Sequence, residues 1–394
     1  MNHNRITGSF SRRGIVMAAA AVLLAGCQII PKSAESTRPV ETAPTPTPEP
    51  SATALPTDET RHRIALLVPM SGSNGAVGQS IANATTMALL DTNADNLRIT
   101  TYDTASGARD AARQAVADGN KLILGPLMGD NIAAVLAEAR PADVPVISYS
   151  NDTRAASVDA FILGHIPEQS IATSVQYARG RGSRDFAVLS PGGDYGERAE
   201  AALQAAVQNY GGRVVGVERY TRGNTSIVSA AQRLQARGGY DTVLLADGPR
   251  LAIQAAGQLK PNGAGATQLL GTELWSGERS ITRASALRGS VFSAVSDTRY
   301  KRYADSYEAR FGSQPYRIST LGYDAVLLVL KISRDWRVGR DFPVSQLRDP
   351  GGFLGVDGAF RFQRNGVVQR AMEVREVRGD EVVTVQNAPA RFDD

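Results

Sequence analysis

The sequence has very few of the residues from which metal sites and many catalytic sites are built. Its 394 residues include one cysteine, Cys27, and three histidines, His3, His62 and His165. A single thiol excludes an intramolecular disulfide and a cysteine-based zinc site. Three isolated histidines leave almost no material for a histidine metal site or a serine–histidine–aspartate triad. We therefore expect no metal and no cofactor, and we interpret His165 as a structural residue.

Motifs for catalysis and for nucleic-acid binding are missing as well. The chain has no Gly-x-Ser-x-Gly elbow, no His-Glu-x-x-His sequence and no phosphate-binding Gly-Lys-Ser/Thr sequence. The glycines from Gly72 to Gly78 are three residues apart, which differs from the dinucleotide fingerprint, and we interpret this stretch as a turn. Arginines are scattered instead of clustered, which argues against a nucleic-acid partner. These absences favour a protein that is not an enzyme.

The first residues have the pattern of an export signal. A basic region without acidic residues, containing Arg12 and Arg13, precedes the apolar run 15–24. That run is about half as long as a membrane-spanning helix requires. Residues 11–15 also resemble a twin-arginine signal, so the general and the twin-arginine export routes both stay open. We predict a signal peptide at residues 1–26.

The apolar run ends at the only cysteine of the chain. Leu24-Ala25-Gly26-Cys27 resembles a bacterial lipoprotein box, in which small side chains precede a cysteine that is acylated and becomes the new N terminus. A single acyl chain binds a membrane only marginally, so a multiply acylated Cys27 predicts a stable anchor. The alternative is a chance cysteine at an ordinary cleavage site. Gln28 is compatible with transport to the outer membrane by the sorting rule known for lipoproteins.

The segment after Cys27 is too polar and too rich in proline to form a core. Such chains favour extended polyproline II at about 3.1 Å per residue, so this segment could hold a folded body up to roughly 100 Å from a membrane. We interpret residues 27–60 as the acylated cysteine and a semi-rigid linker, with a passive connection as the alternative. Its prolines are Pro31, Pro39, Pro44, Pro46, Pro48, Pro50 and Pro56.

From Arg63 onward, short apolar runs alternate with amphipathic segments of helical period. Such alternation predicts parallel sheets covered by helices on both faces, and the region 61–394 exceeds what one core comfortably holds. We therefore predict two doubly wound α/β lobes. The predicted strands are Ile64–Val68, Arg98–Tyr102, Lys121–Leu124, Val144–Ser148, Ala160–Leu163, Phe186–Leu189, Arg213–Glu218, Thr242–Ala246, Gln268–Gly271 and Ser290–Ala294. The predicted helices are Gly78–Asp91, Ala108–Asp118, Asn131–Ala139, Glu168–Arg179, Gly196–Tyr210, Ser226–Arg237, Pro249–Leu259, Tyr300–Phe311 and Ile318–Ser333.

The end of the chain has a different pattern. The runs Ala359–Gln363 and Val367–Val377 flank Arg364-Asn365-Gly366, and Asn-Gly between alternating runs is a strong hairpin signal. A second turn precedes Val382–Val385. We predict that the chain closes with an antiparallel β appendage.

Several of these segments, in this order, resemble a type I periplasmic binding protein domain of the Leu/Ile/Val-binding kind, over about 63–385. The motifs are individually weak, and their order and spacing carry the resemblance. They are Ile64–Ser71, Leu122–Pro126, Pro145–Ser148, Phe186–Leu189, Asp194-Tyr195-Gly196, Asn209–Gly212 and Thr320–Ala325. Within that superfamily, the closing stretches Phe353–Gly358 and Phe360–Gly366 are similar to those of the penicillin-binding protein activator lipoproteins, which carry such a domain on an outer-membrane anchor.

The resemblance implies a division of the domain 61–394 into two lobes that the chain enters more than once. It implies crossings near His165, Thr272 and Val356. A ligand would then lie between the lobes at the carboxyl ends of the strands. The implied first lobe is about 61–164 with 272–355, and the implied second lobe is about 165–271 with 356–394.

The resemblance also supplies candidate ligand contacts. After Gly125-Pro126, the chain has Leu127-Met128-Gly129-Asp130 where the family has a serine pair, and an acid there would repel a ligand carboxylate; the alternative for Asp130 is a helix-start residue. Hydroxyls follow the fourth strand, Tyr195 could stack on a ligand, and Asp247 or Glu273 could take an ammonium group, although each could equally cap a turn or join the lobes. The candidates are Ser71, Ser148, Tyr149, Ser150, Tyr195, Asp247 and Glu273.

Two non-enzymatic functions follow as expectations. The first is a lipid-anchored periplasmic regulator that contacts a peptidoglycan synthase, a penicillin-binding protein, from the outer membrane. The linker favours it because reach through the cell wall requires length, and the altered carboxylate site at 127–130 points the same way. The alternative is a lipid-anchored solute-binding component of an amino-acid ABC importer, which would hold a small amino-acid-like ligand.

Overall fold

The computed structural model describes residues 60–260, 267–390 and 392. The predicted signal peptide, Cys27 and the linker as far as residue 59 lie outside these residues. All described residues belong to one unit, Ala54–Asp394. Within the described part of the chain, no helix combines the length and the apolar character needed to cross a membrane.

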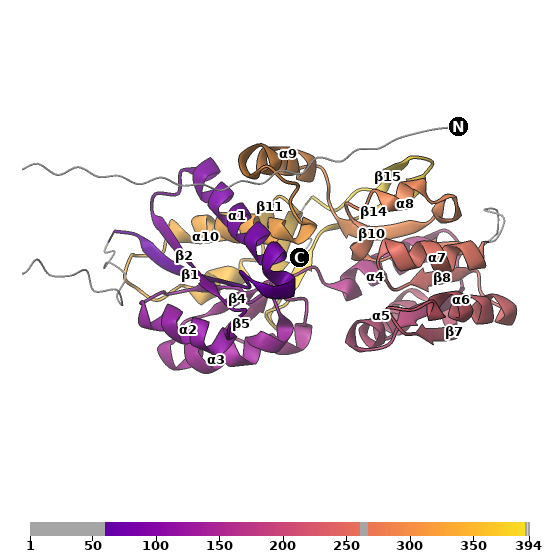
Figure 1. Cartoon of the computed structure of the whole chain (residues 1–394), viewed down its shortest axis with the longest axis horizontal. Coiled ribbons are helices and arrows are strands. Elements are labelled where there is room, and N and C mark those ends of the chain that lie inside the picture. Colours follow the sequence, from indigo (N-terminus) through magenta and orange to yellow (C-terminus); the bar gives the residue numbers. More distant parts are fainter. Residues whose placement is uncertain (1–59, 261–266, 391, 393–394) are drawn as a thin grey trace, which may run out of the picture. The chain divides into compact units, whose positions relative to one another are not determined.

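Five parallel strands form the sheet of the first lobe, in the order β2-β1-β3-β4-β5. Figure 1 shows the α2–α3 pair and the α1–α10 pair on opposite sides of this sheet. Both faces are therefore covered, which explains why the strands are apolar on both faces. The strands are β1 (His62–Val68), β2 (Leu97–Asp103), β3 (Ile123–Leu124), β4 (Val146–Ser148) and β5 (Ala160–Ile162). The helices are α1 (Gly75–Thr92), α2 (Ala108–Ala117), α3 (Ile132–Ala139), α9 (Tyr300–Phe311) and α10 (Thr320–Ser333).

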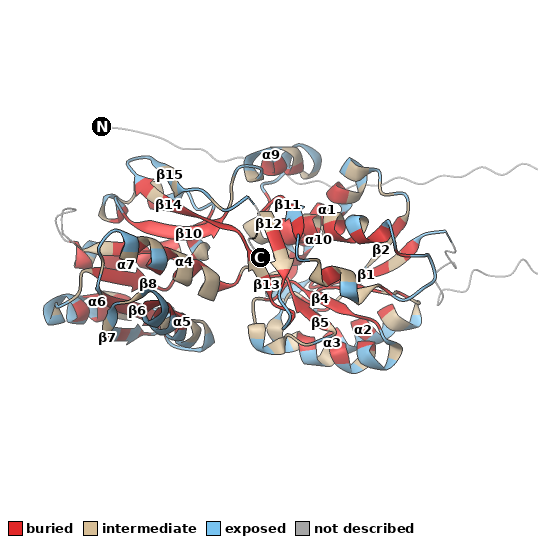
Figure 2. Cartoon of the chain, turned by 180° about the vertical axis from the view of Figure 1, so that it is seen from behind, coloured by how far each residue is buried: buried red, intermediate tan, exposed pale blue. Residues whose placement is uncertain are grey.

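Seven strands form the sheet of the second lobe, in the order β15-β14-β10-β9-β8-β6-β7. The five strands from β6 to β10 are parallel, and β14 and β15 add an antiparallel edge. Figure 2 shows the central strands buried beneath the helices, where α4 packs with α5 and α6 with α7. The strands are β6 (Asp185–Pro191), β7 (Arg213–Tyr220), β8 (Thr242–Leu245), β9 (Gln268–Leu270), β10 (Val291–Val295), β14 (Met372–Arg378) and β15 (Glu381–Gln386). The helices are α4 (Pro167–Gly180), α5 (Asp194–Tyr210), α6 (Ser226–Arg237), α7 (Pro249–Leu259) and α8 (Ser280–Arg283).

A small antiparallel sheet completes the first lobe. It contains β11 (Phe353–Gly355), β12 (Gly358–Phe362) and β13 (Val368–Arg370), and the β12–β13 turn confirms the hairpin predicted at Asn365-Gly366. A bridge between Ile162 and Val367 joins this sheet to the edge of β5. Phenylalanines of the small sheet pack in the core of the first lobe. The structure thus confirms two doubly wound α/β lobes with a small antiparallel sheet near the C terminus.

The chain crosses between the two sheets at three points, two of which lie later than predicted. The first crossing falls between β5 and α4, near His165 as expected. The second was expected near Thr272, but β10 pairs with β9 and β14, so the chain stays in the second lobe until Val295. The third was expected near Val356, but β11–β13 belong with the first lobe, so the chain crosses at Ala371.

The predicted closing run 367–377 is divided between two sheets for the same reason. Its first part, β13, pairs with β12, whereas its second part, β14, pairs with β10. Only Ala371 separates the two strands, and it is buried. The single antiparallel appendage of the prediction is therefore two hairpins, one on each lobe.

Candidate functional site

A cavity of about 460 Å³ lies where the carboxyl ends of strands from both lobes meet. In parallel sheets these ends present loops and helix starts to a ligand. Two short 3-10 helices position much of the lining: η5 (Glu273–Trp275) follows β9, and η7 (Arg317–Ser319) precedes α10. The lining residues are Asn74, Val77, Leu127, Met128, Gly129, Tyr149, Ser150, Asn151, His165, Glu273, Leu274, Ser276, Glu278, Arg317 and Ile318. We call this space the interlobe cavity.

Glu273 places a buried carboxyl group with one unused oxygen in this cavity. The Tyr195 hydroxyl lies 3.2 Å from Glu273 Oε1 and 3.0 Å from Thr272 Oγ1, so it can donate to either. Oε2 is buried and has no hydrogen-bond partner. Burial raises the pKa of Glu273 to about 7. A buried carboxylate without a partner is costly, so this oxygen is suited to a donor supplied by a ligand.

Arg317 provides the cationic side of the cavity. Its Nη1 donates to Asp357 Oδ1 at 2.5 Å, and its guanidinium lies 4.2 Å from the centre of the Tyr300 ring. Its Nε is buried without a hydrogen-bond partner. The cavity therefore carries carboxyl groups at Glu273 and Glu278 of the second lobe and a guanidinium at Arg317 of the first lobe.

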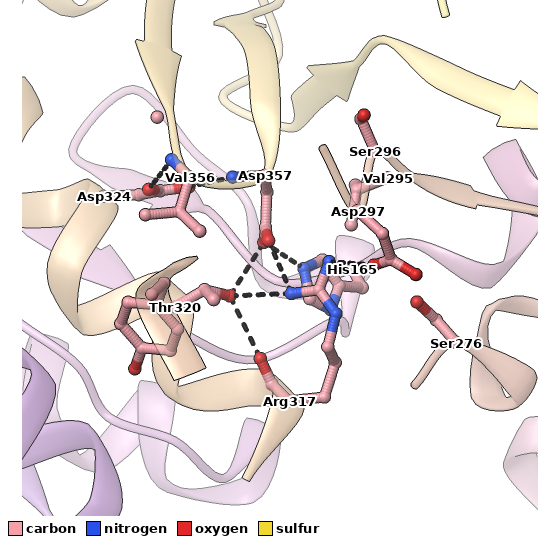
Figure 3. A network of polar contacts seen from close by, with 12 residues as sticks. His165, Ser276, Val295, Ser296, Asp297, Arg317, Thr320, Asp324, Val356 and Asp357 are labelled. Atoms are coloured by element: carbon pink, nitrogen blue, oxygen red, sulfur yellow. Dashed lines mark hydrogen bonds and ion pairs between the residues drawn. The ribbon is translucent and has the colours of Figure 1, made fainter. Parts of the chain in front are cut away.

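A cluster of buried charges joins the chain crossings next to the cavity (Figure 3). Asp357 is completely buried. Its Oδ1 accepts a hydrogen bond from Arg317, and its Oδ2 accepts one from the Thr320 hydroxyl at 2.9 Å and lies 2.7 Å from His165 Nε2. Burial opposes ionisation of Asp357, but Arg317, His165 and Arg370 together hold its pKa below the usual range. We call these residues the hinge cluster, and the role of His165 in it agrees with the structural interpretation made from the sequence.

Two further carboxylates extend the hinge cluster toward each lobe. Asp324 of α10 accepts the Val356 N–H at 2.6 Å and lies 4.0 Å from Arg370 Nη1. Burial, with Asp357 nearby, raises the pKa of Asp324. Asp297 lies on the second crossing between Arg317, at 3.4 Å, and Arg375 of β14, at 2.5 Å. One carboxylate thus connects arginines that belong to different lobes.

The structure brings three of the predicted site residues to the interlobe cavity: Tyr149, Ser150 and Glu273. Ser150 accepts the Asp152 N–H at 3.0 Å, which leaves its own hydroxyl hydrogen for another acceptor. Tyr149 is buried, its hydroxyl lies toward Thr85 without a normal hydrogen bond, and burial raises its pKa.

The other four predicted residues lie away from the cavity lining. Tyr195 does not line the cavity, but its hydroxyl contacts Glu273. Ser148 donates to the Pro126 carbonyl at 2.8 Å inside the first lobe. Asp247 accepts the Tyr220 hydroxyl at 2.6 Å and an arginine at 2.8 Å, so its carboxylate is committed within the second lobe. Ser71 is exposed, with its hydroxyl 3.5 Å from Asp103.

The sequence did not indicate Arg317, Glu278 or Asn74 as cavity residues. Arg317 begins the segment before α10, where no strand end signals a site. The stretch 127–130 departs from the sequence of the resembling family, and Met128 of that stretch lines the cavity. Asp130 is exposed in the first turn of η2 (Gly129–Asn131), which fits its helix-start interpretation. Among the described residues, no group of histidine, cysteine and acidic side chains is arranged to hold a metal.

The fold and this cavity agree with comparisons to known proteins. A family model described as periplasmic binding protein matches residues 62–381. The chain therefore belongs to the periplasmic binding protein family. In sequence it is 29% identical over 143 residues to the uncharacterized protein RP748 of Rickettsia prowazekii (strain Madrid E), a match that spans 36% of this chain and 38% of that protein.

Solved structures with the same fold include several solute-binding proteins of ABC transporters. A candidate branched-chain amino acid ABC transporter protein from Rhodospirillum rubrum superposes with a TM-score of 0.73 at 21% identity, covering 82% of this chain and 100% of that chain. LivJ of Streptococcus pneumoniae, in complex with isoleucine, gives 0.63 at 19%, covering 84% and 100%. A Rhodopseudomonas palustris (R. palustris) solute-binding protein in complex with benzoate gives 0.63 at 15%, covering 85% and 98%. At these identities the likeness establishes the fold.

The raised pKa of Glu273 predicts a specific pH dependence of stability. Because the folded protein binds this proton more tightly than the unfolded chain, whose pKa is near 4.5, the stabilisation is complete below about pH 4.5 and is lost as the pH rises through about 7. We expect this group to lower the free energy of unfolding by roughly 3 kcal/mol between pH 4.5 and pH 8. Urea titrations of wild type and Glu273→Gln at both pH values, without added solute, measure the difference. An identical pH dependence in both proteins would show that Glu273 titrates normally.

Proposed function

We propose that this protein captures a small solute in the interlobe cavity, as the lipid-anchored periplasmic solute-binding component of an ABC importer. The observation that carries the proposal is the cavity between two lobes of a periplasmic binding protein fold, lined by Glu273, whose Oε2 is buried without a hydrogen-bond partner. The cavity volume of about 460 Å³ suits a small molecule. The family and the transport proteins of the same fold support the same class of function.

The polar groups of the cavity favour an amino-acid-like ligand. A cationic or N–H-bearing group would pair with Glu273 and Glu278, and an anionic or carbonyl oxygen would accept from Arg317 Nε and from the Ser150 hydroxyl. The body of the ligand would contact the apolar side chains of Met128, Leu127 and Val77. Charged hydrogen bonds of this kind orient a ligand inside a mostly apolar cavity.

A second candidate function is regulation of a peptidoglycan synthase from an outer-membrane anchor. It is supported by the proline-rich linker and by the altered stretch 127–130, which places Met128, 40% exposed, where the resembling family has hydroxyls. In that case the two-lobed domain would contact a penicillin-binding protein, and the cavity would serve no transport.

Purification of the intact lipoprotein from its native envelope, in mild detergent, separates the two candidates. The importer proposal expects a membrane permease to co-purify, together with uptake that fails when the protein is deleted. Recovery of a penicillin-binding protein without a permease, and a defect in cross-link synthesis with normal uptake, would replace it with the regulator.

The anchor is tested separately by Cys27→Ser. Because a serine cannot form the thioether to diacylglycerol, we expect the variant to leave the membrane fraction and to migrate as an uncleaved or mis-cleaved form. Fractionation of envelopes and intact-mass measurement report both properties. A variant that sediments with membranes and has the wild-type mature mass would show that acylation of Cys27 is not the anchor.

A further inference from the structure

A second cavity, of about 490 Å³, lies on the first lobe beside α9 and shares no lining residue with the interlobe cavity. It is formed where α1, α9, α10 and β11 meet, next to the second chain crossing. The residues that matter for its chemistry are Met87, Arg299, Arg302, Tyr303, Tyr323 and Leu354. We call this space the α9 groove.

The floor of the α9 groove is apolar and aromatic. Met87 is 1% exposed and Tyr303 is 5% exposed, so both belong to the core beneath the groove. The rings of Tyr303 and Tyr323 meet edge to face with centres 5.7 Å apart. Leu354, in contrast, is 58% exposed at the edge. A firmly packed aromatic floor with an exposed leucine offers apolar contact to a bound molecule.

The charged groups of the groove are unbalanced in favour of arginine. Arg299 Nη1 donates to the Gly355 carbonyl at 3.3 Å and meets no carboxylate, and Arg302 has no polar partner among the described residues. The acid that lines the groove, Asp91, is occupied by Arg310 at 2.5 Å and by the Tyr323 hydroxyl at 3.1 Å. Two guanidinium groups are therefore left without a carboxylate beside an apolar floor.

We propose that the α9 groove is a second binding site, for a small amphipathic carboxylate whose aryl or alkyl body lies on the Tyr303 floor and whose carboxylate meets Arg299 and Arg302. Arginine recognises carboxylates by paired, charge-assisted hydrogen bonds. The volume is that of a small-molecule site. This site is independent of the function proposed for the interlobe cavity.

An occupant of the α9 groove would also touch the segment that adjoins the hinge cluster. Gly355 and Val356 line the groove, the Val356 N–H donates to Asp324 at 2.6 Å, and the next residue is Asp357. The segment that a ligand contacts is thus held by the same carboxylates that fix the chain crossings. The α9 groove therefore lies where a bound ligand can affect the junction between the lobes.

Isothermal titration of the full-length protein in detergent with 2-naphthylacetate tests the proposal. We expect saturable binding with one site, weakened by at least about tenfold in the double variant Arg299→Gln/Arg302→Gln, since charged hydrogen bonds are lost. The matched control Arg250→Gln/Arg283→Gln, which removes two exposed arginines of the second lobe, should bind like wild type. Ser306→Trp should block the groove, whereas Ser306→Ala should not.

Several results would overturn the proposal. If the wild-type protein fails to bind 2-naphthylacetate, or binds only an acidic peptide, the α9 groove is not a site for a small carboxylate. If the protein binds the uncharged 2-naphthylethanol with equal affinity, or if the arginine double variant loses no affinity for 2-naphthylacetate, the arginines do not recognise the carboxylate. Loss of probe binding in Glu273→Ala with retention in Ser306→Trp would place the probe in the interlobe cavity.

Discussion

Replacing Glu273 with alanine is expected to weaken solute binding by at least about 30-fold. In the interlobe cavity, Glu273 offers a buried carboxylate oxygen that no group of the protein satisfies. Removing it would leave the cationic or N–H group of a bound solute unpaired and shielded from water, which typically costs at least about 2 kcal/mol. Calorimetric titration of the solute recovered from the native protein measures the loss.

Two matched variants distinguish the loss of a ligand contact at Glu273 from a general effect on the protein. Glu197→Ala removes an exposed acid from the first turn of α5 in the same lobe and should bind like wild type. Tyr195→Phe removes only the hydroxyl that contacts Glu273 and should weaken binding by a smaller factor. Wild-type affinity in Glu273→Ala would mean that the solute is held elsewhere.

Replacing Asp357 with asparagine is expected to lower the free energy of unfolding by about 3–5 kcal/mol. The substitution keeps the volume of the side chain but removes its negative charge. Arg317 at 2.5 Å and Arg370 at 3.8 Å would then be buried cations with too little negative charge near them. Urea unfolding followed by circular dichroism gives the change in stability.

The control for this substitution is Asp335→Asn. Asp335 is exposed after α10, and its replacement should change the free energy of unfolding by less than about 0.5 kcal/mol. If Asp357→Asn is no less stable than Asp335→Asn, the hinge cluster contributes no net electrostatic stabilisation to the folded protein.

The elements of the fold could be predicted because their signals are local. Each predicted strand and helix of the two lobes corresponds to an observed element, since short apolar runs between amphipathic segments are typical of covered parallel sheets. The lobe boundaries could not be predicted in the same way. The apolar run Val291–Val295 predicts a buried strand in either sheet. Only its pairing with β9 and β14 assigns it to the second lobe.

The residues of the candidate site also differ in whether a local sequence signal could indicate them. Ser150 and Glu273 follow strands, so their position at a carboxyl end of a sheet was predictable. Arg317 precedes a helix and reaches the cavity only because the chain has crossed back to the first lobe. The commitment of Asp247 to Tyr220 is a contact between segments distant in sequence, which no spacing pattern signals.

The most direct test of solute capture is enrichment of small molecules from a native periplasmic extract. Wild type and Glu273→Ala would be immobilised at equal density, incubated with the extract, washed and eluted by denaturation for mass spectrometry. We predict that at least one low-mass compound bearing both a cationic and an acidic or carbonyl group is enriched on wild type and absent from the variant. Identical small-molecule profiles for the two proteins would contradict capture in the interlobe cavity.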